Sequence, residues 1–348
     1  MLTKLTKVLL GWQADEEELS LARSILPDCD VRAVPSHATL TRFDCDPGIL
    51  AQHAKDADIL ATFTIGPEVY RSAERMKLLL WLHSGFDPVD FAALKERHVM
   101  LANASGSNAT AVAEHAFALL LALAKRIVER DARVKQGGWA PFWASETSSA
   151  LLAGSTVTIV GLGEIGRRVA QRARAFECRV IGVRRSGRPS PEADVVYGPD
   201  KLCEALSRAD FVVMATPHTA ETNAMISHQE LAAMKPGSFL INVCRGRVVD
   251  EIALRAALDS GHLGGFASDV WWVYANSMPE GWHYAVPSRL GIHQLKSVVA
   301  SHDSAVDNLK VKTEMITRGL QNGRAYLDKA PMPNLVFDGE KMVGSLAD

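Results

Sequence analysis

Short apolar runs alternate with amphipathic stretches over the first hundred residues. Each run is rich in β-branched or large apolar residues, and a turn and a helix-forming segment follow it. The predicted strands lie at residues 7–11, 30–34, 59–63, 78–83 and 99–103. Strands that alternate with helices predict a parallel sheet that is covered on both faces.

From Asn108 the pattern changes to one long helix, which is apolar on most sides. A second and more regular alternating series follows it. Its predicted strands lie at residues 156–160, 179–183, 211–215, 239–243, 266–270 and 297–300. This series predicts a doubly wound α/β domain of about two hundred residues beside a smaller α/β unit. A last helix, at 304–321, is expected to cross back to the first unit, and the polar end containing Pro331 and Pro333 to form a tail.

Composition narrows the function classes. The 348 residues are 47% apolar, and 38 basic against 40 acidic side chains leave a formal charge of −2. The apolar content excludes a disordered chain. The near-zero net charge argues against nucleic acid or anionic membranes as partners. The five scattered cysteines contain no C-x-x-C pair, which predicts reduced thiols and no metal site. The longest apolar run, 116–124, is far shorter than the ~20 residues of a membrane span. With no signal-peptide pattern at the start, a cytoplasmic protein is expected.

A glycine-rich loop provides the first candidate chemistry. The predicted strand 156–160 runs directly into Gly161-Leu-Gly163-Glu164-Ile165-Gly166 and then into a helix-forming stretch. In such a loop the first glycine permits the tight turn, the second lets a pyrophosphate approach the backbone, and the third allows close helix packing. Free N–H groups at the helix start then face the phosphates. This context predicts a dinucleotide site.

The end of the next strand bears on which dinucleotide binds. An acidic residue there would accept hydrogen bonds from a ribose 2′-hydroxyl, but the chain has Arg184, Arg185 and Ser186. Two guanidinium groups and a hydroxyl suit a 2′-phosphate, so NADP(H) is favoured and NAD(H) remains possible. The alternative is that both arginines belong to a solvated turn.

Four stretches together resemble the D-isomer-specific 2-hydroxyacid dehydrogenase family, which includes glyoxylate/hydroxypyruvate reductases and formate dehydrogenases. They are residues 108–115, the glycine loop, 240–250 and 265–271. The resemblance implies two doubly wound parallel-sheet domains. A Rossmann NAD(P)-binding domain at 105–302 would be inserted into a flavodoxin-like substrate domain formed by 1–104 and 303–348. The substrate is expected in the cleft between them.

The resemblance also implies catalytic roles. Arg245, in the I-N-x-x-R-G motif, is expected to bind the substrate carboxylate and carbonyl oxygen, and its charge would polarise the carbonyl for hydride attack. His302 matches the acid/base histidine of the family, the residue type whose unperturbed pKa suits reversible proton transfer. Ser301 stands before it where the family usually has proline.

One position departs from the family pattern. A glutamate that pairs with the histidine is normally found where this chain has Tyr274. Either Tyr274 contacts His302, which still works as the acid/base and loses efficiency above neutral pH, or a carboxylate from elsewhere, such as Glu280, reaches it. Formate dehydrogenases of the family also lack the glutamate, because hydride abstraction from formate needs no acid/base step.

The remaining site residues are expected from matching family positions. Ser84 and Gly85 are expected to hold the substrate carboxylate with backbone N–H groups, and Thr64 to belong to a neighbouring substrate loop. Trp143 is expected to reach the partner subunit's site and restrict it to small substrates, and simple dimer packing is the alternative. The cofactor ribose and nicotinamide are expected to contact Thr216, Pro217, Val243, Cys244 and Asp269.

The favoured function is therefore a homodimeric, NADPH-preferring reductase of small 2-keto acids such as glyoxylate, hydroxypyruvate or pyruvate. Two alternatives remain at this point. One is formate dehydrogenase-type hydride abstraction without an acid/base step, and the other is a non-catalytic dinucleotide-sensing protein, which retention of Arg245 and His302 argues against.

Overall fold

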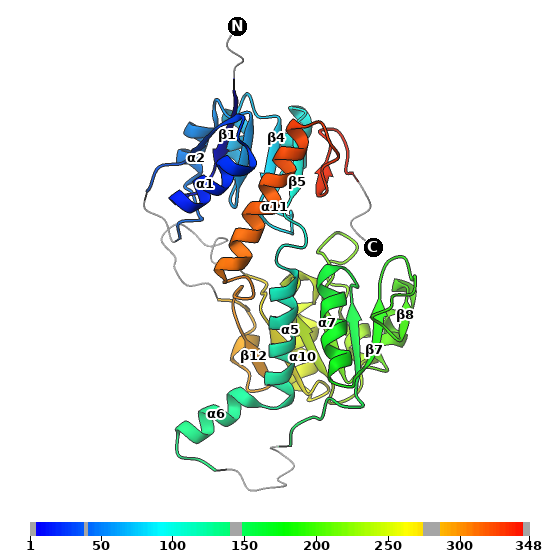
Figure 1. The fold of residues 1–348 in the computed structure, drawn as a ribbon. Helices are drawn as coiled ribbons and strands as arrows, with labels where there is room; N and C mark the ends of the chain where they lie inside the picture. The colour runs from blue at the N-terminus through cyan, green and yellow to red at the C-terminus, as the bar shows by residue number, and fades with distance from the viewer. Residues whose placement is uncertain (1–4, 38–40, 140–147, 274–285, 344–348) are drawn as a thin grey trace. The chain divides into compact units, whose positions relative to one another are not determined.

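The computed structural model describes residues 5–37, 41–139, 148–273 and 286–343. It divides the chain into two compact units. Unit 1 comprises Met1–Asn108 and Asn308–Ala347, and unit 2 comprises Ala109–Asp307. Figure 1 shows the fold and labels some of the elements of each unit.

Unit 1 is built on a six-stranded sheet. Its strands are β1 (Thr6–Leu10), β2 (Cys29–Ala33), β3 (Ile59–Thr62), β4 (Leu78–Trp81), β5 (Met100–Asn103) and β13 (Leu335–Phe337). The order is β13-β5-β4-β3-β1-β2, and every pair is parallel except β13 with β5. The direction of winding reverses between β1 and β3, so ligands are expected at the carboxyl ends of these strands.

Helices cover this sheet. They are α1 (Glu16–Ile25), α2 (Pro47–Ala54), α3 (Pro67–Ser72), α4 (Phe91–Glu96) and α11 (Leu309–Leu327). Figure 1 shows α11, from the end of the chain, lying with unit 1, where it packs on α1, β4 and β5. Strands β3 and β4 are buried along their whole length, as a sheet with helices on both faces requires.

Unit 2 contains a seven-stranded parallel sheet. Its strands are β6 (Thr156–Val160), β7 (Arg179–Val183), β8 (Val195–Tyr197), β9 (Phe211–Met214), β10 (Phe239–Asn242), β11 (Gly265–Ser268) and β12 (Val298–Ala300). The order is β12-β11-β10-β9-β6-β7-β8. This is the doubly wound order of a Rossmann fold with one added strand, and its switch point lies between β6 and β9.

The helices of unit 2 are α5 (Ala109–Ala124), α6 (Ile127–Lys135), α7 (Glu164–Ala175), α8 (Leu202–Leu206), α9 (His228–Ala233) and α10 (Glu251–Asp259). Short 3-10 turns lie at Pro199–Lys201, Gly246–Val248 and Ile292–Gln294. Helices α5 and α7 lie side by side on one face of the sheet (Figure 1), and their apolar residues share one core with β6 and β9. The two doubly wound α/β units confirm the predicted fold class.

Two predictions at the end of the chain are wrong. The segment with Pro331 and Pro333 is not only a tail, because Leu335–Phe337 forms β13 and pairs antiparallel with β5. The last helix runs from Leu309 to Leu327 and not from 304 to 321. It begins after Asn308, whose side chain caps the helix by accepting from the Lys310 N–H at 2.9 Å.

The described part of the chain has no helix that combines the length and the apolar content needed to cross a bilayer.

Candidate active site

The glycine loop adopts the geometry that a dinucleotide phosphate requires. Gly161 follows β6 with a φ of 101°, and a Cβ atom there would lie 2.6 Å from the carbonyl oxygen of Ala215. Gly163 precedes α7, and nothing lies within 4 Å of the place where its Cβ would be. At Gly166 a Cβ would lie 1.8 Å from the Gly161 carbonyl oxygen. The loop therefore combines a forced turn, open space over the helix start and tight helix packing, which fits a bound pyrophosphate.

Because the space at Gly163 and Gly166 differs, alanine substitutions at the two positions should affect different properties. Gly166→Ala should lower the stability by roughly 1–3 kcal/mol, because overpacking forces the backbone apart. Gly163→Ala should leave the melting temperature of the cofactor-free protein unchanged but weaken dinucleotide binding, because its methyl group enters the open space. Thermal unfolding and cofactor titration of both variants check this prediction. Equal loss of stability in the two variants would contradict it.

Two other residues of the loop have structural contacts. The Glu164 carboxylate pairs with Arg167 and lies 2.7 Å from Arg168, and the hydrogen bond from Arg168 is the main reason why its pKa is lowered. Ile165 packs against the core shared by α5 and α7. At Glu164 the backbone N–H at the helix start, and not the carboxylate, is suited to a phosphate.

The segment after β7 forms a cationic turn. The Arg184 N–H donates to Tyr197 O at 3.1 Å, and the Gly187 N–H donates to Arg184 O at 3.0 Å. The Arg184 Nε is buried and has no hydrogen-bond partner among the residues that the structure describes. A hollow of about 420 Å³ lies beside the turn. It is lined by Arg185, Ser186, Gly187, Val196, Tyr197, Gly198, Pro199, Asp200 and Lys201. Arg184 does not itself line the hollow, whereas the cations Arg185 and Lys201 do, and two cations in one hollow fit a phosphate group.

The loop after β9 lies opposite the glycine loop at the switch point. Gly161 approaches the peptide group between Ala215 and Thr216. The following turn is held by Thr222, whose hydroxyl donates to Pro217 O at 2.7 Å and accepts from the Thr219 N–H. Thr216 and Pro217 are thus fixed at the carboxyl edge of the sheet, where the ligands of doubly wound sheets bind.

The I-N-x-x-R-G motif forms a rigid turn at the end of β10. The Asn242 side chain donates to Arg245 O at 3.0 Å and accepts from the Cys244 N–H at 3.1 Å. Gly246 is required because a Cβ there would lie 2.3 Å from the backbone of Trp271. Arg245 is half-buried, and its Nη1 donates to Cys244 O at 2.7 Å. This turn presents Arg245 at the edge of the sheet that also carries the glycine loop.

Val243 and Cys244 line the same turn and are buried. Burial raises the pKa of the Cys244 thiol to about 11, so this cysteine is a neutral thiol at physiological pH. It is a packing group beside Arg245 and not a nucleophile. All five cysteines of the chain are free thiols.

His302 is exposed on the turn after β12. Hydrogen bonds hold the backbone on both sides of it, with the Ser301 N–H donating to Ser268 O at 2.9 Å and the Asp303 N–H donating to Asp269 O at 2.7 Å. Asp303 has a φ of 47°, which turns the chain sharply after the histidine. Asp269, which is 2% exposed, is engaged with this turn through its carboxylate as well. Its expected contact with the nicotinamide stays a prediction.

The expected substrate loops of unit 1 follow β3 and β4. The Ser84 hydroxyl donates to Asn108 at 2.9 Å, and Ser84 O accepts from the Asn103 side chain at 2.7 Å. Gly85 O accepts from the Trp81 indole at 2.7 Å. The Thr64 hydroxyl is buried and has no partner among the described residues. Fixed peptide groups and one unsatisfied hydroxyl suit a small polar ligand at the carboxyl edge of this sheet.

Tyr274, Glu280 and Trp143 lie outside the described residues.

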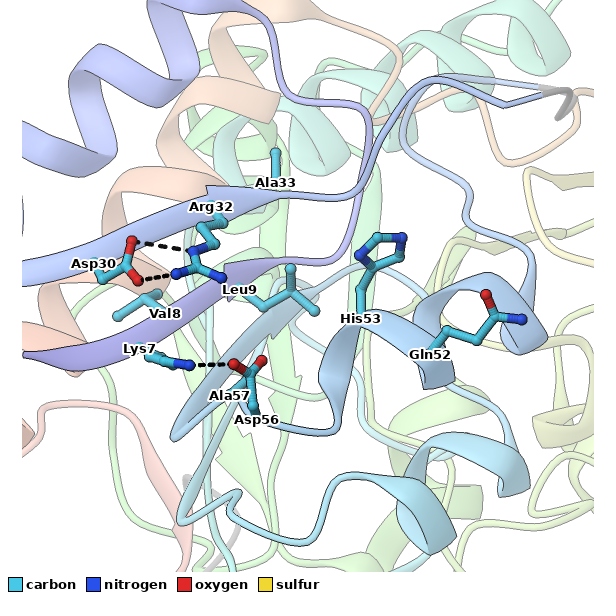
Figure 2. A pocket seen from close by; sticks show the side chains of 10 residues that line it. All are labelled: Lys7, Val8, Leu9, Asp30, Arg32, Ala33, Gln52, His53, Asp56 and Ala57. Atoms are coloured by element: carbon cyan, nitrogen blue, oxygen red, sulfur yellow. Dashed lines mark hydrogen bonds and ion pairs between the residues drawn. The ribbon is translucent and has the colours of Figure 1, made fainter.

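Another hollow, which lies in unit 1, contains none of the predicted site residues. Figure 2 shows this pocket of about 170 Å³ between β1, β2 and the end of α2. Its charged groups pair with one another, Lys7 with Asp56 and Arg32 with Asp30. Because these charges compensate each other, the pocket offers no clear attraction for a charged ligand.

The sequence reasoning did not identify two parts of the site. One is the wall of the hollow at Tyr197 and Lys201, which β8 and the 3-10 turn after it form. The other is the set of contacts around Asp269, which includes His115. The sequence did contain signals for the second part. His115 ends the stretch 108–115 that resembles the family, and Ser301 stands where the family usually has proline.

Comparison with known proteins agrees with this arrangement. Residues 117–287 match the D-isomer specific 2-hydroxyacid dehydrogenase, NAD binding domain. The chain is 35% identical over 232 residues to a glyoxylate reductase of Pyrococcus furiosus. The aligned part covers 64% of this chain and 68% of that relative. The chain belongs to the D-isomer specific 2-hydroxyacid dehydrogenase family. It is therefore an NAD(P)-dependent oxidoreductase of this family, and the predicted family is confirmed.

Two further relatives show the extent of the similarity. A D-3-phosphoglycerate dehydrogenase of Mycobacterium leprae is 38% identical over 208 residues, which is 60% of this chain and 39% of that dehydrogenase. The crystal structure of the TT0316 protein from Thermus thermophilus matches 95% of this chain and 100% of its own, with 29% identity and a TM-score of 0.75. The similarity to this solved structure thus extends over the folds of both units.

Proposed function

We propose that this dehydrogenase reduces a small 2-keto acid of the glyoxylate, hydroxypyruvate or pyruvate type to a D-2-hydroxy acid. The observation that carries the proposal lies in unit 2. One edge of its sheet bears the glycine loop after β6, Arg245 after β10 and His302 after β12. A dinucleotide site, a cation suited to a carboxylate and a proton donor are thus presented by the same edge. The glyoxylate reductase name of the Pyrococcus relative supports this substrate class.

When bound, the nicotinamide supplies the hydride. The role of Arg245 is to orient the substrate carboxylate and to stabilise the negative charge that develops on the carbonyl oxygen. The role of His302 is to donate a proton to that oxygen. The peptide groups of Ser84 and Gly85 and the Thr64 hydroxyl bind the carboxylate from unit 1. Val243, Cys244, Thr216 and Pro217 line the cofactor site.

The test is oxidation of NADPH and NADH with glyoxylate, hydroxypyruvate, pyruvate, phenylpyruvate and 2-ketoglutarate from pH 5 to pH 9. Turnover with the smaller keto acids is expected, because the proposal gives this site a hydride donor, a cation for the carboxylate and a proton donor. Cofactor binding without turnover of any keto acid would overturn the proposal. Formate oxidation would then support the formate dehydrogenase type, and its absence would support a sensor.

We further propose that the cofactor is NADP(H), with the 2′-phosphate held by Arg184, Arg185 and Ser186. The unsatisfied Nε of Arg184 and the hollow lined by Arg185, Ser186 and Lys201 support this choice. Lys201 provides a further cation that sequence reasoning did not include. Asp200, after β8, also lines the hollow, so among its described lining residues the two cations Arg185 and Lys201 outnumber the carboxylate.

Replacing Arg184 and Arg185 by alanine should raise the KM for NADPH by about ten- to a hundredfold, because charge-assisted hydrogen bonds to the phosphate are lost. The KM for NADH should change little, since NADH has no 2′-phosphate. Arg188→Ala is the matched control, because Arg188 is exposed in the same turn and does not line the hollow. Steady-state kinetics with both cofactors decides the matter. An unaltered KM for NADPH would remove the assignment.

The proposal includes a homodimer in which Trp143 restricts the partner's site to small substrates. Helix α6 supports dimerisation because none of its residues is buried. Ile127, Val128 and Val134 are each more than half exposed on it. A helix with this many exposed apolar side chains is typical of an interaction surface.

A further inference from the structure

A buried carboxylate organises the turn that carries His302. The Asp269 Oδ1 accepts hydrogen bonds from the Ser301 hydroxyl at 2.7 Å, from the Ser304 hydroxyl at 3.0 Å and from the Ser304 N–H at 3.1 Å. Its Oδ2 accepts from the Ala305 N–H at 3.1 Å. A buried carboxylate with this many donors is held in one position, and so are the groups that donate to it.

His115 joins this network from a different part of the sequence. It lies on α5, which packs against β11 and β12. Its Nε2 is 2.9 Å from the Ser301 hydroxyl oxygen and 3.2 Å from the Asp269 Oδ1. Because the single hydroxyl hydrogen of Ser301 is donated to Asp269, the hydroxyl oxygen accepts from a hydrogen on the His115 Nε2.

Ser301 is therefore the connecting residue. Its hydroxyl links His115 to Asp269, its N–H donates to Ser268 O, and its carbonyl oxygen accepts from the Trp271 indole at 2.7 Å. Proline at this position would have neither the hydroxyl nor the N–H. The residue that follows Ser301 is His302, so the network fixes the backbone from which the histidine projects.

We propose that His115 and Ser301 are positioning residues, which with Asp269 hold the His302 turn in the geometry required for proton transfer. The inference rests on the proposed function, in which His302 donates the proton. Small displacements of a proton donor from its acceptor reduce the rate of proton transfer strongly. A network connecting helix α5 to the turn limits such displacements.

The test uses four variants of the whole chain. Ser301→Ala and His115→Leu break the link between α5 and the turn, whereas Ser301→Thr keeps the hydroxyl and His115→Gln keeps a donor near the Nε2 position. The two disruptive variants are expected to lower kcat for keto acid reduction about tenfold, with little change in KM or cofactor affinity. The two conservative variants should retain most of the activity. The double disruptive variant should lose no more than about the larger single effect, because both changes break the same network.

A second readout does not depend on turnover. Amide hydrogen exchange of residues 301–305 should be faster in Ser301→Ala and His115→Leu than in the wild type, and exchange in strand β6 should be unchanged. Unchanged kcat in both disruptive variants would overturn the inference, whatever the exchange shows. If the wild type reduces no keto acid, the proposed function fails, and faster exchange would still establish the network. If His302→Ala is inactive but both disruptive variants are fully active, only the positioning role fails.

Discussion

Replacing Arg245 by alanine is expected to lower kcat/KM for keto acid reduction by about a thousandfold, with NADPH affinity retained. The side chain would supply both the ionic contact to the substrate carboxylate and the charge that stabilises the developing alkoxide. Removal of a single donor to such an oxygen already costs about 10²–10³ in rate. The Asn242 bonds to the backbone of Cys244 and Arg245 do not involve the guanidinium group. The turn should therefore survive the substitution, and kinetics with glyoxylate together with cofactor titration measures the two effects separately.

Arg247→Ala provides the matched control. Arg247 lies two residues further on, is exposed, and its backbone carbonyl accepts from the Ala224 N–H. Its replacement should leave kcat/KM unchanged within about twofold, as is usual for an exposed side chain. Arg245→Lys should be impaired more than its charge suggests, because an ammonium group cannot bind two oxygens in the planar geometry of a guanidinium. Turnover by Arg245→Ala at the wild-type rate would remove Arg245 from the site.

The sequence predicted the strands best where both sheet faces are covered. Strands β6 and β7 have the bounds that the pattern predicted, because they are buried apolar runs ending at a glycine or arginine turn. Strand β13 was not predicted, because it has three residues between turn-forming segments and pairs only at the sheet edge. Strand β8 is equally short. Runs of three residues seldom have enough periodicity to be distinguished from loops. Strand β12 has the same length but falls within the strand predicted at 297–300.

The candidate site was predictable to the extent that it depends on local motifs. The glycine loop and the turn at Arg245 are each determined by a few consecutive residues, so their chemistry could be inferred before any coordinates. The network around Asp269 depends on contacts between distant segments, since His115 and Ser301 are 186 residues apart in the sequence. The start of α11 is set instead by the cap at Asn308, whose side chain accepts from the Lys310 N–H.

The network also changes how the missing glutamate is interpreted. In the family pattern a carboxylate pairs with the catalytic histidine itself. In this chain the carboxylate of Asp269 binds the residues on either side of His302, through Ser301 and Ser304. Orientation of the histidine by its backbone does not require a carboxylate at position 274. A departure at one position is therefore compatible with retained acid/base chemistry.

Replacing His302 by alanine is expected to lower kcat for glyoxylate reduction by about 10²–10⁴-fold, which is the usual contribution of a general acid.

Two controls make this result specific to proton transfer. His228→Ala, at an exposed position at the start of α9, should behave as the wild type. Cofactor affinity of His302→Ala should be retained, since the bonds of Ser301 and Asp303 to the neighbouring strand end use backbone atoms. A formate-oxidising activity that survives the substitution would identify hydride abstraction without an acid/base step as the chemistry of this site. Full keto acid reduction by His302→Ala would require a different proton donor.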